Sequence, residues 1–408
     1  MTQPQQLLRK ITMPMLLFYG LGNILGAGIY VLIAEVANTA GMYAPFSFLV
    51  ALVIVSFTAL SYGELASRYP DAAGVALYIN EGIGSTRLSV ITGLTVALAA
   101  LISAATIARG FAGYLAEFAP LLPEWIALAG LIGTLCLIAV WGIGESVAIA
   151  VTLTFVEIGG LLLILWIGLP ALPTLAERVP ELIPPLQWDT WYAISLGGFL
   201  AFYAFLGFED MANIAEEVKA PSEAYPKAII FSLLIATLLY LSVSLVSVLL
   251  LSPEQLSSTD APFAAIYKEA TGNETTVIAV ISIFAIINGA LIQIIMASRM
   301  LYGISKKWWP PSPLSYVSAR TKTPVVSTLL VSTVTMGFSL WLPLVTLANL
   351  TSFLILIVFT VVNIALIRIK LRAPAPKGIY LIPFWVPVTG VVVNILFLTL
   401  QLFSLQGL

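Results

Sequence analysis

The sequence predicts an all-α integral membrane protein of about eleven transmembrane helices, two of which are interrupted near the middle of the membrane. The first observation is composition: of 408 residues, 60% are hydrophobic and only 9% are charged, and the mean hydropathy is +1.03. Soluble proteins average about 25% charged residues. The second is that apolar runs long enough to cross a bilayer recur along the chain. The third is that glycines cluster in the first and sixth of these runs.

Composition also excludes several classes of function. The chain has no histidine, so histidine-based metal sites, proton relays and Ser-His-Asp catalysis are ruled out. We expect no metal, no cofactor and no enzymatic activity. The single cysteine, Cys136, cannot form an intrachain disulfide. The net charge of −2 and the lack of a basic patch argue against a nucleic acid partner, which leaves the lipid bilayer as the expected environment.

Apolar runs of about 20 residues define the expected helices. In chain order they cover 13–36, 43–67, 88–116, 122–142, 146–169, 190–215, 227–251, 275–304, 324–342, 344–367 and 380–404. The longest connections are 170–189, which is rich in proline, and 252–274, where Ser252-Pro-Glu is typical of a helix start. Neither could hold a separate domain, so we expect a single transmembrane domain over 1–408.

Basic residues determine the expected orientation, because Lys and Arg favour the cytoplasmic loops. With the N-terminus inside, the cytoplasmic segments contain Arg9, Lys10, Arg68, Arg87, Lys219, Lys227, Arg299, Lys306, Lys307, Arg320, Lys322, Arg368, Lys370, Arg372 and Lys377. Only Arg178 and Lys268 fall in outer loops, and Arg109 lies within a span. We therefore predict a multi-pass protein of the inner (cytoplasmic) membrane with a cytoplasmic N-terminus. The odd number of helices places the C-terminus outside.

The first span contains a cluster of glycines at Gly20, Gly22, Gly26 and Gly28. Each glycine weakens an exposed helix by about 1 kcal/mol relative to alanine, so the cluster predicts a break. A break at mid-membrane depth directs free N–H groups at an anion and free C=O groups at a cation, and an amino acid carries both charges. The alternative is that these glycines only let neighbouring helices pack closely.

The sixth span has a similar pattern. Gly197, Gly198 and Gly207 lie at mid-membrane depth and are followed by Glu209 and Asp210. The interrupted helices thus open two successive blocks of five, and an odd block length makes the second block enter from the opposite side. This is the geometry of an inverted repeat with its site between the halves. The expected units are 13–169 for the first repeat, 190–367 for the second and 380–404 for an additional helix.

Several motifs, in order along the chain, resemble those of the amino acid–polyamine–organocation transporters. Gly22-Asn-Ile-Leu-Gly-Ala-Gly-Ile-Tyr30 is similar to the first-helix glycine motif of that family, and Tyr62-Gly-Glu-Leu-Ala-Ser-Arg-Tyr-Pro70 to its signature after the second helix. Further similar stretches are Phe202–Asp210, Ala215–Pro221, Ser298–Gly303 and Arg320–Val325. Within the family, Gly28–Val36 and Ala105–Arg109 look closest to the cationic amino acid transporter branch and its bacterial relatives.

The resemblance implies a 5+5 inverted-repeat fold, Na⁺-independent transport and a substrate site at the two broken helices. The substrate carboxylate would meet the first break near Ala27 and Gly28, while the ammonium would meet main-chain carbonyls of both breaks. The expected substrate-binding residues are Asn23, Ile24, Gly26, Ala27, Gly28, Phe202, Tyr203 and Phe205. Two features depart from the family pattern. Members commonly have twelve or more helices, and many have serine where this chain has Ala27.

Glu157 is the most unusual charged residue, because it lies about 16 Å into the fifth span at 1.5 Å per residue. A carboxylate at that depth is costly unless it is paired or protonated, so Glu157 is a candidate for carrying a coupling proton. Proton-using relatives have a lysine at about this place, so their mechanism does not carry over. The alternative is a structural acid paired with Arg109. Glu209 is a candidate for gating or for sensing the substrate amine; otherwise it is a solvated acid at a half-helix start.

The sequence therefore favours a secondary active transporter of neutral amino acids, a proton-coupled symporter or an exchanger, working by alternating access. The preference for neutral substrates follows from the third span, which has no carboxylate. One alternative is a carrier or antiporter of cationic amino acids or polyamines. From a different class, the chain could be an amino-acid-sensing membrane receptor or a channel. The residues expected to take part in coupling or gating are Glu157, Glu209 and Arg109.

Overall fold

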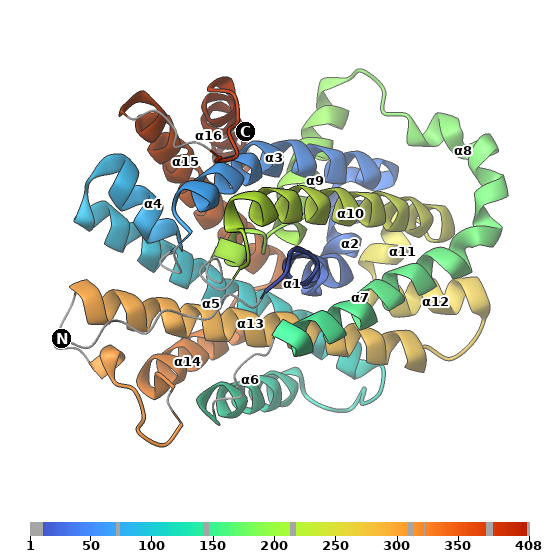
Figure 1. Ribbon diagram of the computed structural model, residues 1–408. Helices are drawn as coiled ribbons and strands as arrows, with labels where there is room; N and C mark the ends of the chain where they lie inside the picture. Colours follow the sequence, from blue (N-terminus) through green and yellow to red (C-terminus); the bar gives the residue numbers. More distant parts are fainter. Residues whose placement is uncertain are drawn as a thin grey trace.

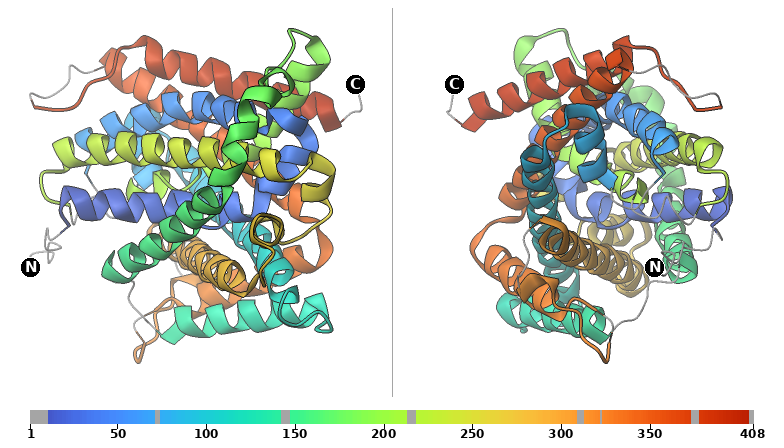
Figure 2. Two further views of the ribbon diagram at one scale, coloured as in Figure 1. Left: turned by 90° about the vertical axis from the view of Figure 1, so that its right-hand side faces the viewer. Right: turned by 60° about the vertical axis from the view of Figure 1, so that its left-hand side comes forward.

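The computed structural model describes residues 11–70, 74–141, 147–212, 218–308, 313–321, 323–372 and 378–405. These residues form a bundle of long helices (Figures 1 and 2). Within them, the only β-type pairing is an isolated bridge between Ile11 and Val218, so the prediction of an all-α protein is confirmed. Some basic residues that determine the expected orientation lie outside the described residues: Arg9, Lys10, Lys322 and Lys377.

Each predicted span coincides with one helix, except that the first and the sixth are interrupted. The first span is divided into α1 (Met13–Leu25) and α2 (Ala27–Ala40). The next four are α3 (Ala44–Arg68), α5 (Thr86–Ala116), α6 (Glu124–Trp141) and α7 (Val147–Gly168). The sixth begins with α9 (Trp188–Ala204). The remaining five are α10 (Pro221–Leu250), α13 (Thr276–Trp308), α14 (Val325–Trp341), α15 (Leu344–Arg372) and α16 (Trp385–Leu405).

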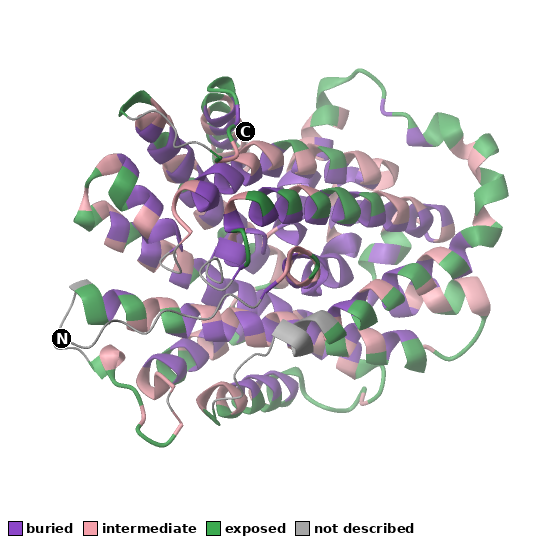
Figure 3. Ribbon diagram, in the orientation of Figure 1, coloured by how far each residue is buried: buried purple, intermediate pink, exposed green. Residues whose placement is uncertain are grey.

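The lengths and surfaces of these helices fit a bilayer. Nine apolar segments of the described chain are long enough to cross a membrane, and α14 is a shorter apolar helix of 17 residues. The first of the nine spans 56 residues because it holds α1, α2 and α3 in succession. Peripheral helices such as α6 and α7 carry exposed positions (Figure 3), including the large apolar side chains of Trp141 and Trp166. The protein is therefore a multi-pass membrane protein.

Short helices occupy several connections. They are α4 (Gly74–Ile83), α8 (Leu175–Leu182), α11 (Pro253–Ser257) and α12 (Pro262–Thr271). The helix start expected at Ser252 is confirmed. The Ser252 hydroxyl accepts from the Gln255 amide, and the Gln255 side chain accepts from the Ser252 amide. This reciprocal capping box satisfies two amides that the start of a helix leaves free.

The interrupted helices lie inside the bundle. Helix α2 packs on α9, while α1 packs on α10 and α7, and α5 and α13 form the most extensive helix pair around them. A Cβ at Gly28 would lie 2.6 Å from the Cα of Ala204, so only glycine lets α2 approach α9 this closely. Close packing therefore accounts for Gly28, whereas the break itself lies at Gly26.

The two ends of the described helical region lie on opposite sides of the molecule. In the left view of Figure 2, α1 begins at one end of the bundle and α16 ends at the other. This placement accords with the predicted odd number of crossings between the start of α1 and the end of α16.

Candidate functional site

The first helix is interrupted at Gly26, which has the non-helical dihedral angles φ −41° and ψ −135°. Its N–H donates to the carbonyl oxygen of Gly22 at 3.1 Å, and α2 then begins at Ala27. The first amides of any helix have no acceptor within that helix, so those of Ala27 and Gly28 face the break. The predicted interruption of the first helix is therefore confirmed.

The second interruption follows α9, whose last residue is Ala204. Turns cover 205–208 and a single 3-10 turn covers 209–212. Gly207 has φ +123°, and a Cβ there would lie 2.6 Å from the carbonyl oxygen of Asn23, so glycine is required where the two breaks meet. The Gly207 N–H donates to the Glu209 carboxylate at 2.8 Å. The predicted interruption is confirmed, and the Glu209 side chain closes the turn that forms it.

A buried tyrosine of α10 joins the two breaks. The Tyr240 hydroxyl oxygen lies 2.6 Å from the carbonyl oxygen of Ile24 and 2.8 Å from that of Ala204. The same ring packs edge-on against Phe205. Tyr240 therefore holds the last turns of α1 and α9 together. Sequence reasoning missed this residue, because it lies within a long apolar run that carries no local signal.

A small cavity lies between the two breaks. Its volume is about 30 Å³, enough for about one or two water molecules. The expected residues that line it are Asn23, Ile24, Ala27, Gly28 and Tyr203. The lining residues that sequence reasoning missed are Ser103, Ile107, Ala204, Leu206, Gly289, Ile292 and Gln293.

Three of the expected binding residues do not line this cavity. Phe202 packs edge-on against Phe359, and Phe205 packs against Tyr240. Gly26 also lies outside the lining, although it makes the break. The two phenylalanines are fully buried, and their rings pack in the protein interior next to the site.

The polar groups of the cavity are neutral. Both side-chain polar atoms of Asn23 are buried and have no hydrogen-bond partner in the described part of the chain. Leaving such an atom unpaired costs about 1–3 kcal/mol, so an unpaired amide here indicates a place for a ligand or water. Among the described residues, the lining contains no Asp, Glu, Lys or Arg.

Two of the lining residues join α9 to α5 at the cavity. The Tyr203 hydroxyl oxygen lies 2.8 Å from the Ser103 hydroxyl oxygen and 3.1 Å from the Ser103 carbonyl oxygen. On another side, Gly289 of α13 faces the start of α2. A Cβ at Gly289 would lie 3.4 Å from the amide nitrogen of Ala27, so the glycine leaves that amide open to the cavity.

Glu157 of α7 is fully buried and contacts the helix that carries Gly289. The Asn288 side-chain amide donates to the Glu157 carboxylate at 3.0 Å, and the Tyr30 hydroxyl donates to the Glu157 carbonyl oxygen at 2.6 Å. The second carboxylate oxygen of Glu157 has no partner among the described residues. Because Asn288 directly precedes Gly289, α13 connects this acid to the cavity.

The alternative in which Arg109 pairs with Glu157 is wrong. An Arg109 guanidinium nitrogen lies 2.8 Å from the Glu124 carboxylate. Arg109 belongs to the half of α5 that follows Ile107, near the start of α6, whereas Glu157 contacts α13 and α2. Sequence reasoning could not separate these arrangements, because depth in a span does not specify which neighbouring helix a side chain faces.

Comparisons with known proteins identify the family. The amino acid permease family matches residues 11–408. The branched-chain amino acid permease BcaP of Bacillus subtilis is 28% identical over 387 residues, which cover 87% of this chain and 79% of that protein. The methylthioribose transporter of the same organism is 27% identical over 96% of this chain and 87% of its own length.

A plant protein extends the comparison to larger relatives. The mitochondrial cationic amino acid transporter 3 of Arabidopsis thaliana is 28% identical over 91% of this chain, which spans only 64% of that protein. Together with the many apolar helices, the family match establishes the class of protein. The chain belongs to the amino acid permease family, as a multi-pass membrane protein that transports amino acids and is not an enzyme.

Proposed function

We propose that the protein is a secondary active transporter of neutral amino acids that binds its substrate between the two interrupted helices. The observation that carries this proposal is the cavity between the breaks, where the Asn23 amide is unpaired and no charged side chain is present among the described lining residues. An uncharged lining suits the side chain of a neutral amino acid, while the helix ends at the breaks suit its two charged groups.

The substrate carboxylate binds at the start of α2. There the free amides and the positive end of the helix dipole favour an anion. Ala27 carries no hydroxyl, so main-chain N–H groups provide this contact, with the Asn23 amide beside them. The substrate ammonium binds toward the carbonyl ends of α1 and α9. The Ile24 and Ala204 carbonyls already share the Tyr240 hydroxyl, and their second lone pairs remain for the ligand.

Substrate access requires movement. A cavity of about 30 Å³ is far smaller than the pockets of about 300 Å³ or more that hold small-molecule ligands. We propose that entry separates Tyr203 from Ser103, whose hydroxyl oxygens lie 2.8 Å apart at the cavity. We propose that α9 moves relative to α5 in an alternating-access cycle. The 5+5 inverted repeat over 13–169 and 190–367, with 380–404 as an additional helix, provides the two inverted halves for that cycle.

Glu157 carries the coupling proton in this proposal. Its side chain is fully buried, and within the described part of the chain its carboxylate accepts one hydrogen bond, from the neutral Asn288 amide. A carboxyl group in such a place is stable when protonated, and losing the proton leaves a costly unpaired charge. Binding and release of the proton therefore act on α13, which also faces the substrate through Gly289. The alternative to proton-coupled transport is that the same site serves an exchanger, which does not accumulate substrate.

Cationic amino acids or polyamines are the second candidate substrates, because the chain is similar to transporters named for cationic amino acids. Against them, Glu209 is engaged with the Gly207 amide, so no described carboxylate faces the cavity. The methylthioribose transporter, at similar identity, makes an uncharged thiosugar a useful further test compound.

Uptake into liposomes by the purified protein tests the proposal. Radiolabelled leucine and alanine should enter saturably, and more should accumulate when the pH gradient is imposed. Arginine, putrescine or methylthioribose competing better than leucine would overturn the neutral amino acid assignment. Uptake that rises linearly without saturation would indicate a channel, and binding without uptake would indicate a receptor.

A further inference from the structure

One side chain links Glu157 directly to the helix that starts at the first break. Tyr30 of α2 is fully buried, and its hydroxyl donates to the Glu157 carbonyl oxygen at 2.6 Å. Tyr30 follows Ala27 by about 4.5 Å along the helix at 1.5 Å per residue. The Tyr30 side chain and the amides of Ala27 and Gly28 therefore belong to the first turn of one helix, so a pull on Tyr30 reaches the proposed carboxylate site.

The packing around Tyr30 places its hydroxyl against α7. A Cβ at Gly160, less than one turn beyond Glu157, would lie 2.5 Å from the Tyr30 hydroxyl oxygen, so the glycine leaves room for that hydroxyl. The Tyr114 hydroxyl donates to the Tyr30 carbonyl oxygen at 2.8 Å and accepts from the Phe263 amide at 3.2 Å. The Phe263 ring packs edge-on against the Tyr30 ring. Groups from α5, α7 and α12 therefore hold this tyrosine in place.

The hydrogen bond from Tyr30 to the main chain of α7 can be exchanged at little cost. The Glu157 carbonyl lies inside α7, where the amide four residues further on already donates to it. One carboxylate oxygen of Glu157, in contrast, is buried and has no partner among the described residues. A hydroxyl rotates to suit its acceptor, and a hydrogen bond to an ionised group is about twice as strong as one between neutral groups. The Tyr30 hydroxyl therefore favours the carboxylate once Glu157 loses its proton.

No other described side chain is placed to make this contact instead. Tyr240 also interacts with Glu157, but its hydroxyl is engaged with two carbonyl oxygens. No Lys or Arg of the described ranges forms an ion pair with Glu157. Among the helices on which α7 packs, α1 has no charged residue. The charged residues of the others are Glu223 and Lys227 at the start of α10, Lys268 and Glu269 on α12, and Arg299, Lys306 and Lys307 beyond Asn288 on α13.

We propose that Tyr30 is a positioning residue that passes the protonation state of Glu157 to the start of α2. When Glu157 is protonated, the hydroxyl stays on the main chain of α7, and the amides at the start of α2 are free to bind the substrate carboxylate. When the proton leaves to water, the hydroxyl turns to the ionised carboxylate and draws α2 toward α7, which weakens substrate binding. The inference rests on the proposed function, with Glu157 as the proton carrier.

Leucine binding to the purified full chain, measured from acidic to alkaline pH, tests this role. In wild type the affinity should be about tenfold higher at the acidic end, a usual strength of coupling between two sites. Tyr30→Phe keeps the ring on Phe263 and removes the hydroxyl, so its affinity should change less than about twofold over the same range. Its melting temperature should match wild type, because the Glu157 carbonyl keeps its partner within α7.

Three further variants separate the hydroxyl from the rest of the side chain. Gly160→Ala places a methyl group where the hydroxyl lies, so it should flatten the pH dependence while the tyrosine is kept. Tyr225→Phe is the control, because it removes another buried hydroxyl, at the start of α10, that has no described partner. It should keep the pH dependence of wild type. Adding Tyr30→Phe to Glu157→Gln should change nothing further, since the two residues act through one contact.

The possible outcomes distinguish the role of Tyr30 from the proposed function. A flat pH dependence in Glu157→Gln beside a normal one in Tyr30→Phe would overturn the role of Tyr30 and leave proton coupling by Glu157 standing. Equal flattening in Tyr225→Phe would also overturn it, because the effect would then follow the loss of any buried tyrosine hydroxyl. A wild-type affinity that does not depend on pH, with no gradient-driven accumulation of leucine, would overturn both.

Discussion

Glu157 is a buried acid whose carboxylate receives one hydrogen bond, from the Asn288 side chain at 3.0 Å. A glutamine at this position can turn its oxygen toward Asn288 and keep that bond. Because Arg109 is paired elsewhere, the substitution strands no buried cation. The ion pair between Glu157 and Arg109, which the sequence left open, is therefore excluded. The coupling role of Glu157 stays a prediction.

Glu157→Gln should fold normally and uncouple transport, since glutamine imitates a permanently protonated glutamate. Leucine exchange across reconstituted vesicles should survive, while accumulation driven by a pH gradient should be lost. Uptake with and without the gradient, read beside the melting temperature, checks this. Glu177→Gln, which changes an exposed acid on α8, is the control. A stable Glu157→Gln protein with normal gradient-driven accumulation would remove Glu157 from the mechanism.

Tyr240 is the other single residue on which the site depends. Tyr240→Phe removes a hydroxyl that lies within 2.8 Å of two carbonyl oxygens, leaving both buried groups without that partner. Each unpaired buried group costs about 1–3 kcal/mol, so thermal stability and leucine affinity should both fall. Tyr316→Phe, at an exposed position, should change neither. An unchanged melting temperature and affinity in Tyr240→Phe would show that the breaks do not need this bridge.

Among the elements, the interrupted helices were the most predictable from sequence. Glycine clusters predicted both breaks. Apolar runs predicted the bounds of the other long helices to within six residues. The lining contributed by α5 and α13 was not predictable. Ser103 and Gly289 lie within long apolar helices where small residues also serve ordinary packing. Phe202 and Phe205 were expected at the site, but their rings pack against Phe359 and Tyr240 instead.

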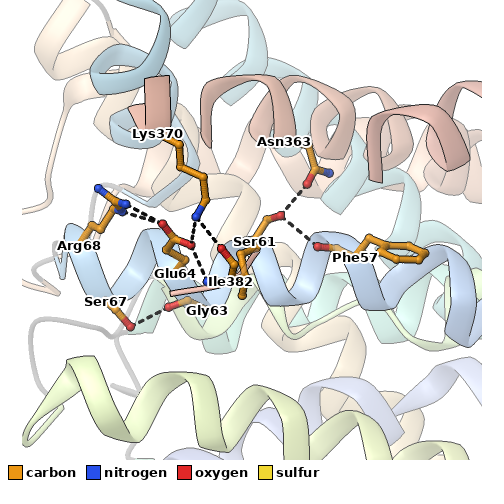
Figure 4. A network of polar contacts seen from close by, with 9 residues as sticks. All are labelled: Phe57, Ser61, Gly63, Glu64, Ser67, Arg68, Asn363, Lys370 and Ile382. Atoms are coloured by element: carbon orange, nitrogen blue, oxygen red, sulfur yellow. Dashed lines mark hydrogen bonds and ion pairs between the residues drawn. The ribbon is translucent and has the colours of Figure 1, made fainter. Parts of the chain in front are cut away.

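The signature after the second helix has a structural explanation at the scale of elements. Glu64 of α3 is fully buried and pairs with Arg68 at 2.7 Å and with Lys370 of α15 at 2.6 Å (Figure 4). The same carboxylate accepts from the Ile382 amide, and Lys370 donates to the Ile382 carbonyl oxygen. This cluster joins α3, α15 and the segment that leads into α16.

Glu64→Gln should therefore destabilise the bundle. Removing one partner of a buried ion cluster leaves charges uncompensated and costs about 3–5 kcal/mol. The melting temperature of the purified protein should fall clearly below that of wild type. Glu81→Gln, an exposed position on neighbouring α4, should have no such effect. Equal melting temperatures for the two variants would mean that the cluster does not anchor α16.

At the scale of the whole molecule, α1 begins at one end of the bundle and α16 ends at the other (Figure 2). Together with the distribution of basic residues along the chain, this arrangement predicts an N-in, C-out topology. Protease-cleavable tags at the two ends should show cleavage of the C-terminal tag and protection of the N-terminal tag in intact cells. Protection of both tags would require an even number of crossings.

The central claim is that the amino acid binds between the breaks, against the start of α2. Gly289→Ala tests it, because the added Cβ would lie 3.4 Å from the Ala27 amide nitrogen, an ordinary contact that the fold tolerates. Gly303→Ala is the matched control on α13, where an added Cβ meets nothing within 4 Å.

The decisive measurement is the affinity of these two variants for leucine. Gly289→Ala should bind leucine at least tenfold more weakly, as expected when about 1.4 kcal/mol or more of binding energy is lost. Gly303→Ala should bind leucine with wild-type affinity, and the two variants should have equal melting temperatures. Wild-type leucine affinity in a correctly folded Gly289→Ala protein would contradict it.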